Sequence, residues 1–129
     1  MSPSLDAIGI VTTELERSLA FYRLLGVDVP AAGEGHVEAT LPNGLRLMWD
    51  TVEVIRSFNP TWQPPTGGPG QSLAFLCANA VEVDTIVEAL AANGFTVARP
   101  PWDASWGQRY ATVVDPDGNH VDLFAALSG

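Results

Sequence analysis

The stretch Tyr110 to Ala125, YATVVDPDGNHVDLFA, sets two apolar segments on either side of the sequence Asp115-Pro116-Asp117-Gly118-Asn119. Proline suits the first central position of a β-turn because its ring restricts φ, and glycine tolerates the positive φ that such turns often need. The flanking segments, Tyr110 to Val114 and His120 to Ala125, are rich in β-branched and aromatic residues, which favour strands. The stretch therefore predicts a β-hairpin near the end of the chain.

The residues before this hairpin predict a strand, a helix and a further strand. Ser72 to Ala78 is an apolar run of the length typical of a buried strand. The apolar stripe of the helix that follows consists of Val83, Ile86, Val87 and Leu90. Asn93-Gly94 then ends the helix, and Phe95 to Ala98 resumes as a strand.

The first half of the chain carries the same order of elements. Leu5 to Val11 suits a buried strand, and Thr12-Thr13-Glu14 offers residues that commonly start a helix. The apolar stripe of that helix consists of Leu15, Leu19, Tyr22 and Leu25, and Gly26 ends it. The strands predicted next are Val27 to Pro30, Gly35 to Leu41 and Leu45 to Asp50, the last two joined by a tight turn at Pro42-Asn43-Gly44.

The two halves therefore predict an internal repeat. Superposing Ile8 on Leu73, an offset of 73 − 8 = 65 residues, places strand on strand and helix on helix. We expect one domain over residues 1–129, with repeat one at about 5–58, a connecting loop at 59–71 and repeat two at about 72–126. The loop holds four prolines and three glycines, so it is either a functional rim or lid or a rigid connector.

Charge and composition exclude several classes of function. Six Lys and Arg against fifteen Asp and Glu give a net charge of 6 − 15 = −9, which disfavours binding to nucleic acid or to an anionic membrane. The one cysteine, Cys77, cannot form an intramolecular disulfide and is expected mid-strand as a small buried side chain. The N-terminus lacks a signal-peptide pattern, and no apolar stretch reaches the roughly 20 residues of a membrane span. We therefore expect a cytoplasmic protein.

Two motifs carry a family resemblance, namely the helix sequence Glu14-Leu15-Glu16-Arg17-Ser18-Leu19-Ala20-Phe21-Tyr22 and the turn Asp115-Pro116-Asp117-Gly118-Asn119. In a strand-helix-strand-strand-strand unit written twice, they resemble the glyoxalase/bleomycin-resistance, or vicinal-oxygen-chelate, superfamily. Residues 47–53, 64–68 and 102–111 are similar to mitomycin-resistance-type drug-binding proteins. The resemblance implies an α+β fold in which two βαβββ repeats form a cupped mixed sheet. It also implies a homodimer in which both chains complete each cavity.

Enzymes of that superfamily hold a divalent metal through one residue on the first strand and one on the last strand of each repeat. Carried over to this sequence, these positions fall on Ala7, Ser72 and Asp122 and near Met48. Alanine and methionine offer no hard oxygen or imidazole ligand, and a serine hydroxyl is a poor one. We therefore expect neither a metal site nor a cofactor. His120 alternates with Asp122 along one strand, so a chelating pair and a surface imidazole both stay open there.

Aromatic side chains are the main candidates for contact with a ligand. The sequence has four tryptophans, all predicted on a sheet edge or in a loop, and Trp106 lies between small neighbours that leave both faces of its indole accessible. The resemblance implies that Trp106 and Phe58 line opposite walls, where two rings would hold a planar molecule by stacking. Trp62, in the connecting loop, is a further candidate. Trp49 and Trp102 admit two interpretations, a lid on the core or part of the ligand site.

Polar side chains would orient such a ligand. Asp50 shares strand parity with Met48, so both belong to the site if Met48 faces the cup; alternatively, Asp50 caps a short helix over Thr51 to Arg56. Tyr110 and Arg109 are further candidates, and Arg109 has the alternative of pairing with an acid. The candidate ligand-binding residues are Trp106, Phe58, Met48, Asp50, Trp102, Trp62, Ser72, Tyr110 and Asp122, and no residue is assigned as catalytic.

The sequence thus favours a protein that binds and sequesters a planar aromatic antibiotic or related metabolite without a metal. Mitomycin, bleomycin, anthracycline and quinoxaline-like molecules are the expected kinds of ligand, and the role would be self-resistance or transport of the compound. The alternative is an atypical enzyme of the same superfamily, an isomerase, cyclase or ring-opening enzyme with Asp122, His120 or Asp50 as acid or base. A paralogue with a vestigial cavity is the third hypothesis. Motifs of nucleophilic enzymes and of phosphate-binding loops are absent from the sequence.

Overall fold

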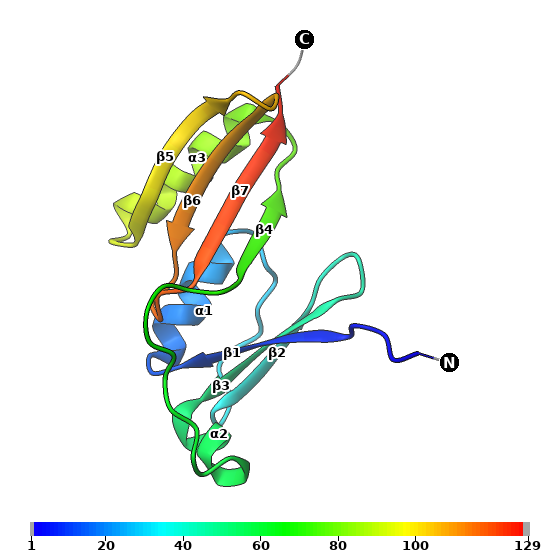
Figure 1. Cartoon of the computed structure of the whole chain (residues 1–129), viewed down its shortest axis with the longest axis vertical. Helices are drawn as coiled ribbons and strands as arrows, with labels where there is room; N and C mark the ends of the chain where they lie inside the picture. Colours follow the sequence, from blue (N-terminus) through cyan, green and yellow to red (C-terminus); the bar gives the residue numbers. More distant parts are fainter. Residues whose placement is uncertain (1, 128–129) are drawn as a thin grey trace. The chain divides into compact units, whose positions relative to one another are not determined.

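The computed structural model describes residues 2–127 and divides into two compact units between Pro64 and Pro65 (Figure 1). The first unit contains β1 (Ala7–Thr12), α1 (Leu15–Leu24), β2 (His36–Thr40), β3 (Arg46–Thr51) and α2 (Val52–Phe58). The second contains β4 (Ser72–Leu76), α3 (Ala80–Ala92), β5 (Thr96–Ala104), β6 (Gln108–Val114) and β7 (His120–Ala126). The predicted mixed α+β fold is confirmed, with one sheet of three strands and one of four. Within residues 2–127, no helix is both long and apolar enough to cross a membrane.

The second unit is a four-stranded sheet with α3 packed on one face. The strand order is β4-β7-β6-β5, in which β4 runs parallel to β7 and the other pairs are antiparallel. The helix contacts β5, β6 and β7, and lies behind them in Figure 1. The fully buried apolar side chains of this core include Val83 and Leu90 of the helix and Val113, Val121 and Leu123 of the sheet. Because strand side chains alternate between faces, the residues between these sheet positions point away from α3.

The turn between β6 and β7 is stabilised by the side chain of Asp115. Its Oδ1 accepts hydrogen bonds from the backbone N–H groups of Asp117 and Asn119, and its Oδ2 accepts one from Asn119 Nδ2. Gly118 adopts a φ of +87°, a conformation that few other residues take readily. The hairpin predicted from this sequence is thus confirmed.

The first unit is a three-stranded sheet in the order β1-β3-β2, with β1 parallel to β3 and β2 antiparallel to it. Leu19 and Tyr22 of α1 are fully buried, as is Trp49 of β3. The rings of Tyr22 and Trp49 meet edge to face with centroids 5.5 Å apart. Trp49 was predicted on a sheet edge or loop, and that prediction is wrong, because β3 is the central strand and its inward positions form the core.

The predicted repeat is confirmed in the spacing of its elements. The strands β1 and β4 begin 72 − 7 = 65 residues apart, and the helices α1 and α3 begin 80 − 15 = 65 residues apart. Repeat one nevertheless lacks a strand, since the segment predicted over Val27 to Pro30 is not one. The side chain of Arg23 donates hydrogen bonds to the carbonyl oxygens of Val29 and Pro30. Because Pro30 also has no backbone N–H, the segment does not form the hydrogen bonds of a strand. The missing strand corresponds to β5, one of the two edge strands of the second sheet.

Candidate functional site

The strongest candidate site lies on the face of the second sheet that points away from α3. Residues paired on adjacent strands share a face, and the register pairs Trp102 with Tyr110 and Tyr110 with Phe124. These three residues therefore form one row across β5, β6 and β7. The indole of Trp106 joins them from the turn after β5. We call Trp102, Trp106, Tyr110 and Phe124 the aromatic cluster.

The rings of the aromatic cluster are in continuous contact. Tyr110 stacks on Phe124 with centroids 6.0 Å apart and an interplanar angle of 23°. Trp106 meets Tyr110 edge to face at 5.6 Å and meets Trp102 in the same way at 5.4 Å. The indole N–H of Trp106 donates to Gln108 Oε1 at 2.9 Å, which orients the ring. Trp106 is nevertheless 58% exposed, so a large part of its surface is accessible to a ligand.

Asp122 supplies a carboxylate beside these rings. Tyr110 Oη donates to its Oδ2 at 2.7 Å, and Thr112 Oγ1 donates to its Oδ1 at 2.9 Å. Burial, reinforced by the contact with Asp122, raises the pKa of Tyr110 to about 12. The phenol therefore stays protonated at neutral pH and acts as a donor, not as a base. The predicted residues Tyr110 and Asp122 are thus brought together, and Thr112, which sequence reasoning missed, completes the arrangement.

Two arginines of the second unit have different surroundings. The guanidinium of Arg99 lies 4.0 Å from the centroid of the Trp102 ring, in a cation–π contact. Arg109 instead pairs with Asp84 at 3.0 Å and with Asp103 at 3.1 Å. These hydrogen bonds, that to Asp84 above all, raise the pKa of Arg109. Of the two interpretations of Arg109, the ion pair with acids is therefore the one that the structure supports.

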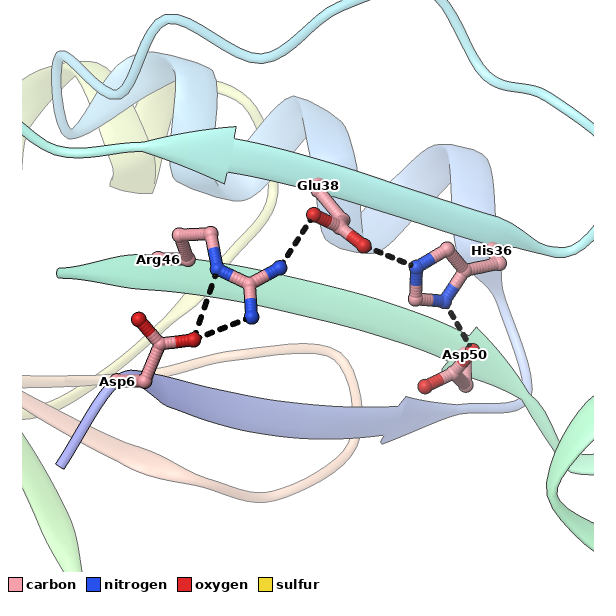
Figure 2. A network of polar contacts seen from close by, with 5 residues as sticks. All are labelled: Asp6, His36, Glu38, Arg46 and Asp50. Atoms are coloured by element: carbon pink, nitrogen blue, oxygen red, sulfur yellow. Dashed lines mark hydrogen bonds and ion pairs between the residues drawn. The ribbon is translucent and has the colours of Figure 1, made fainter. Parts of the chain in front are cut away.

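The first unit carries a chain of ion pairs on the sheet face opposite its core (Figure 2). His36 Nδ1 lies 2.5 Å from Asp50 Oδ1, and His36 Nε2 lies 2.8 Å from Glu38 Oε2. Arg46 then bridges Glu38, at 2.6 Å, and Asp6, at 2.5 Å. The hydrogen bonds to Glu38 and Asp50 raise the pKa of His36, and the contacts with His36 and Arg46 lower the pKa of Glu38. We call these five residues the charge chain.

The structure excludes one of the two interpretations of Asp50, that of a helix cap, and leaves its place in a ligand site a prediction. The short helix α2 is capped by Thr51, whose Oγ1 accepts a hydrogen bond from the backbone N–H of Val54. Asp50 is therefore not the cap, and its carboxylate faces His36 on the same sheet face as Met48. Sequence reasoning missed His36 as the partner of Asp50, and it missed Glu38 and Arg46 as further members of the charge chain. Their strand parity was available in the sequence, but the register between β2 and β3 was not.

Three further residues that the sequence analysis singled out are Trp62, Phe58 and Cys77. Trp62 follows α2 and lies beneath the guanidinium of Arg56, whose carbon is 5.7 Å from the ring centroid. Phe58 ends α2 and is 71% exposed. Phe58 and Trp106 belong to different units, and their pairing across a ligand stays a prediction. Cys77 is buried but follows β4 instead of lying mid-strand, and burial raises the pKa of its thiol.

The positions carried over from metal-dependent relatives do not fit a metal centre. Ala7 and Met48 provide no hard ligand on the first unit, and both carboxylate oxygens of Asp122 already accept hydroxyl hydrogen bonds. Ser72 lies on β4 opposite His120, two residue pairs away from Asp122 along the strands. Among residues 2–127, no group of three His, Cys, Asp or Glu side chains is arranged to hold a metal ion.

Comparison with known proteins agrees with this architecture. The family model described as Glyoxalase/Bleomycin resistance protein/Dioxygenase superfamily matches residues 4–123. The chain belongs to this superfamily, whose members include both enzymes and binding proteins. A comparison with curated proteins found no match. The expected likeness to mitomycin-resistance-type proteins stays a prediction.

Solved structures with the same fold come from several bacteria. A glyoxalase/bleomycin resistance protein/dioxygenase from Nocardioides is 29% identical, with a TM-score of 0.76 over 100% of this chain and 87% of that one. A family enzyme from Burkholderia phytofirmans is 19% identical, with a TM-score of 0.83 over 97% and 100% of the two chains. A glyoxalase-related enzyme from Fulvimarina pelagi is 22% identical, with a TM-score of 0.81 over 95% and 87%. The last two likenesses show the fold alone.

Proposed function

We propose that this protein binds a small planar aromatic molecule on the aromatic cluster of its second unit, as a sequestering or carrier protein. The observation that carries the proposal is the exposure of Trp106, whose ring touches those of Trp102 and Tyr110 in the aromatic cluster. An exposed indole whose N–H is already bonded to Gln108 presents its ring surface without an unsatisfied donor. Such a surface favours a flat ligand, because aromatic pairs gain about 0.5–1.5 kcal/mol beyond the burial of their area.

Phe58, Met48 and Asp50 of the first unit stay predicted contacts of such a ligand. Antibiotics with flat chromophores, such as mitomycins, anthracyclines, bleomycins and quinoxaline-type compounds, are the kinds of molecule that this site would take. A role in self-resistance follows if the producing cell makes the ligand. A homodimer, in which both chains contribute to each site, is part of the same proposal.

The proposal is tested by titrating the purified protein with an anthracycline and with a mitomycin while tryptophan fluorescence is recorded. We expect saturable quenching in the wild type and a loss of affinity of about ten- to a hundred-fold in Trp106→Ala. Val81→Ala is the matched control, because Val81 is also an apolar side chain of the second unit, 70% exposed, and lies at the start of α3. Equal affinities in the wild type and Trp106→Ala would reject the aromatic cluster as the site.

The enzymatic alternative is separated by chemistry and metal content. A binding protein returns its ligand unchanged, whereas an isomerase, cyclase or ring-opening enzyme changes the absorption or mass of the compound. We expect protein purified without added metal to contain well under one ion per chain by elemental analysis. A stoichiometric divalent ion that survives mild chelation, together with turnover of the ligand, would replace the binding proposal with the enzymatic one.

A further inference from the structure

The aromatic cluster is accompanied by a negative charge at a fixed position. Asp122 lies on β7, two residues before Phe124, so its side chain and the ring of Phe124 share one sheet face. Two hydroxyl donors from β6, those of Tyr110 and Thr112, hold one carboxylate oxygen each. A carboxylate oxygen has two acceptor positions, so each oxygen keeps one for a further donor.

The same face already holds a planar cation. The guanidinium of Arg99 lies over the Trp102 ring at the outer strand of the sheet. Aromatic faces attract cations because their quadrupole is negative above the ring. Trp106, Tyr110 and Phe124 extend that surface from β5 towards β7, where Asp122 supplies the opposite charge. The excess of acidic residues gives the chain a net charge of −9, and its long-range field attracts cations, as the carboxylate of Asp122 does.

From this arrangement we infer that Asp122 makes the site selective for a planar aromatic cation, with the ring on the aromatic cluster and the charged or N–H-bearing edge at Asp122. The inference rests on the proposed function and names the ligand class of that same site. A neutral molecule of the same shape gains the stacking contacts but not the charge-assisted hydrogen bond, so it binds more weakly.

The test uses two flat tricyclic probes, proflavine, which is cationic at pH 8, and acridine, which is neutral there. Both are titrated by fluorescence against the wild type, Asp122→Asn and Glu88→Gln. The last variant removes the same single charge from an exposed position on α3, the helix that covers the opposite face of the sheet. We expect the wild type to bind proflavine at least tenfold more tightly than acridine. We expect Asp122→Asn to lose about tenfold in affinity for proflavine, with little change for acridine, and Glu88→Gln to behave as the wild type.

The outcomes separate the inference from the proposed function. If the wild type binds both probes with equal affinity, the site for planar molecules stands and the selectivity for cations is rejected. If Glu88→Gln loses as much proflavine affinity as Asp122→Asn, the long-range field and not Asp122 is responsible, which also rejects the inference. If neither probe binds to the wild type, both proposals fail. The comparison of the two probes on the wild type needs no variant, so a poorly folded Asp122→Asn leaves the inference testable.

Discussion

The phenol of Tyr110 on β6 donates a 2.7 Å hydrogen bond to Oδ2 of Asp122 on the neighbouring strand β7. The same ring stacks on Phe124 and meets Trp106, so one residue joins the aromatic cluster to the carboxylate. Tyr110→Phe keeps the ring and removes the hydroxyl. We expect it to lower the free energy of unfolding by about 1 kcal/mol, because the carboxylate loses one of two protein donors. Urea unfolding measures this, and a variant as stable as the wild type would contradict it.

The charge chain predicts a pH dependence of stability in which His36 is the titrating group. The pKa of His36 is raised in the folded protein, so its stabilising contribution is complete below the unfolded value of about 6.5 and is lost as the pH rises through the folded pKa. A neutral imidazole has one N–H and cannot donate to both Glu38 and Asp50. We expect melting temperatures in the wild type to fall as the pH rises above the unfolded value of about 6.5.

His36→Gln should remove most of that slope, and added salt should reduce it, because the charge chain is partly exposed. The chain has two histidines, so His120→Gln is the matched control and should retain the slope. If the slope persists in His36→Gln and disappears in His120→Gln, the prediction that His36 is the titrating group is wrong.

The different environments of Trp49 and Trp106 predict different losses of stability when each is replaced by alanine. Trp49 is fully buried against Tyr22, and Trp49→Ala should cost about 3–5 kcal/mol of stability because it leaves a large cavity. Trp106 is 58% exposed, and Trp106→Ala should change stability much less. Denaturant unfolding of both variants measures the difference. A loss of stability in Trp106→Ala equal to that in Trp49→Ala would make Trp106 a lid on the core.

The pairing of Phe58 with Trp106 is tested by removing the first of these rings. If Phe58 stacks on the ligand, Phe58→Ala should weaken binding of an anthracycline by about 1–3 kcal/mol, while the melting temperature changes little because Phe58 is exposed. Leu5→Ala is the control, since Leu5 is a similarly exposed apolar residue of the first unit. Identical affinities in Phe58→Ala and the wild type would remove Phe58 from the site.

The predicted homodimer is measured by light scattering at micromolar protein concentration. A two-fold dimer is the commonest symmetric assembly, and we expect a mass of twice the 13.7 kDa of one chain. A mass of one chain over the whole concentration range would show that each ligand site is built from one chain alone.

The sequence by itself determined the repeat and most of its elements. Local signals were sufficient for this, since Gly26, Gly44 and Gly94 each adopt a positive φ where a predicted helix ends or a predicted hairpin turns. The stripes of α1 and α3 repeat every three to four residues, which predicts a buried helix face before any partner is known. These preferences act within a few residues, so they can be recognised without the fold.

Only the tertiary structure decided what the polar residues contact. The segment after Gly26 has strand-like residues, yet the carbonyl oxygens of Val29 and Pro30 accept hydrogen bonds from the Arg23 side chain and the segment joins neither sheet. Trp49 and Trp106 have the same side chain, but one lies on the inward face of a central strand and the other in a turn. The pairs Asp50 with His36 and Asp122 with Tyr110 depend on the register between strands, which is set by packing over the whole sheet and not by either strand alone.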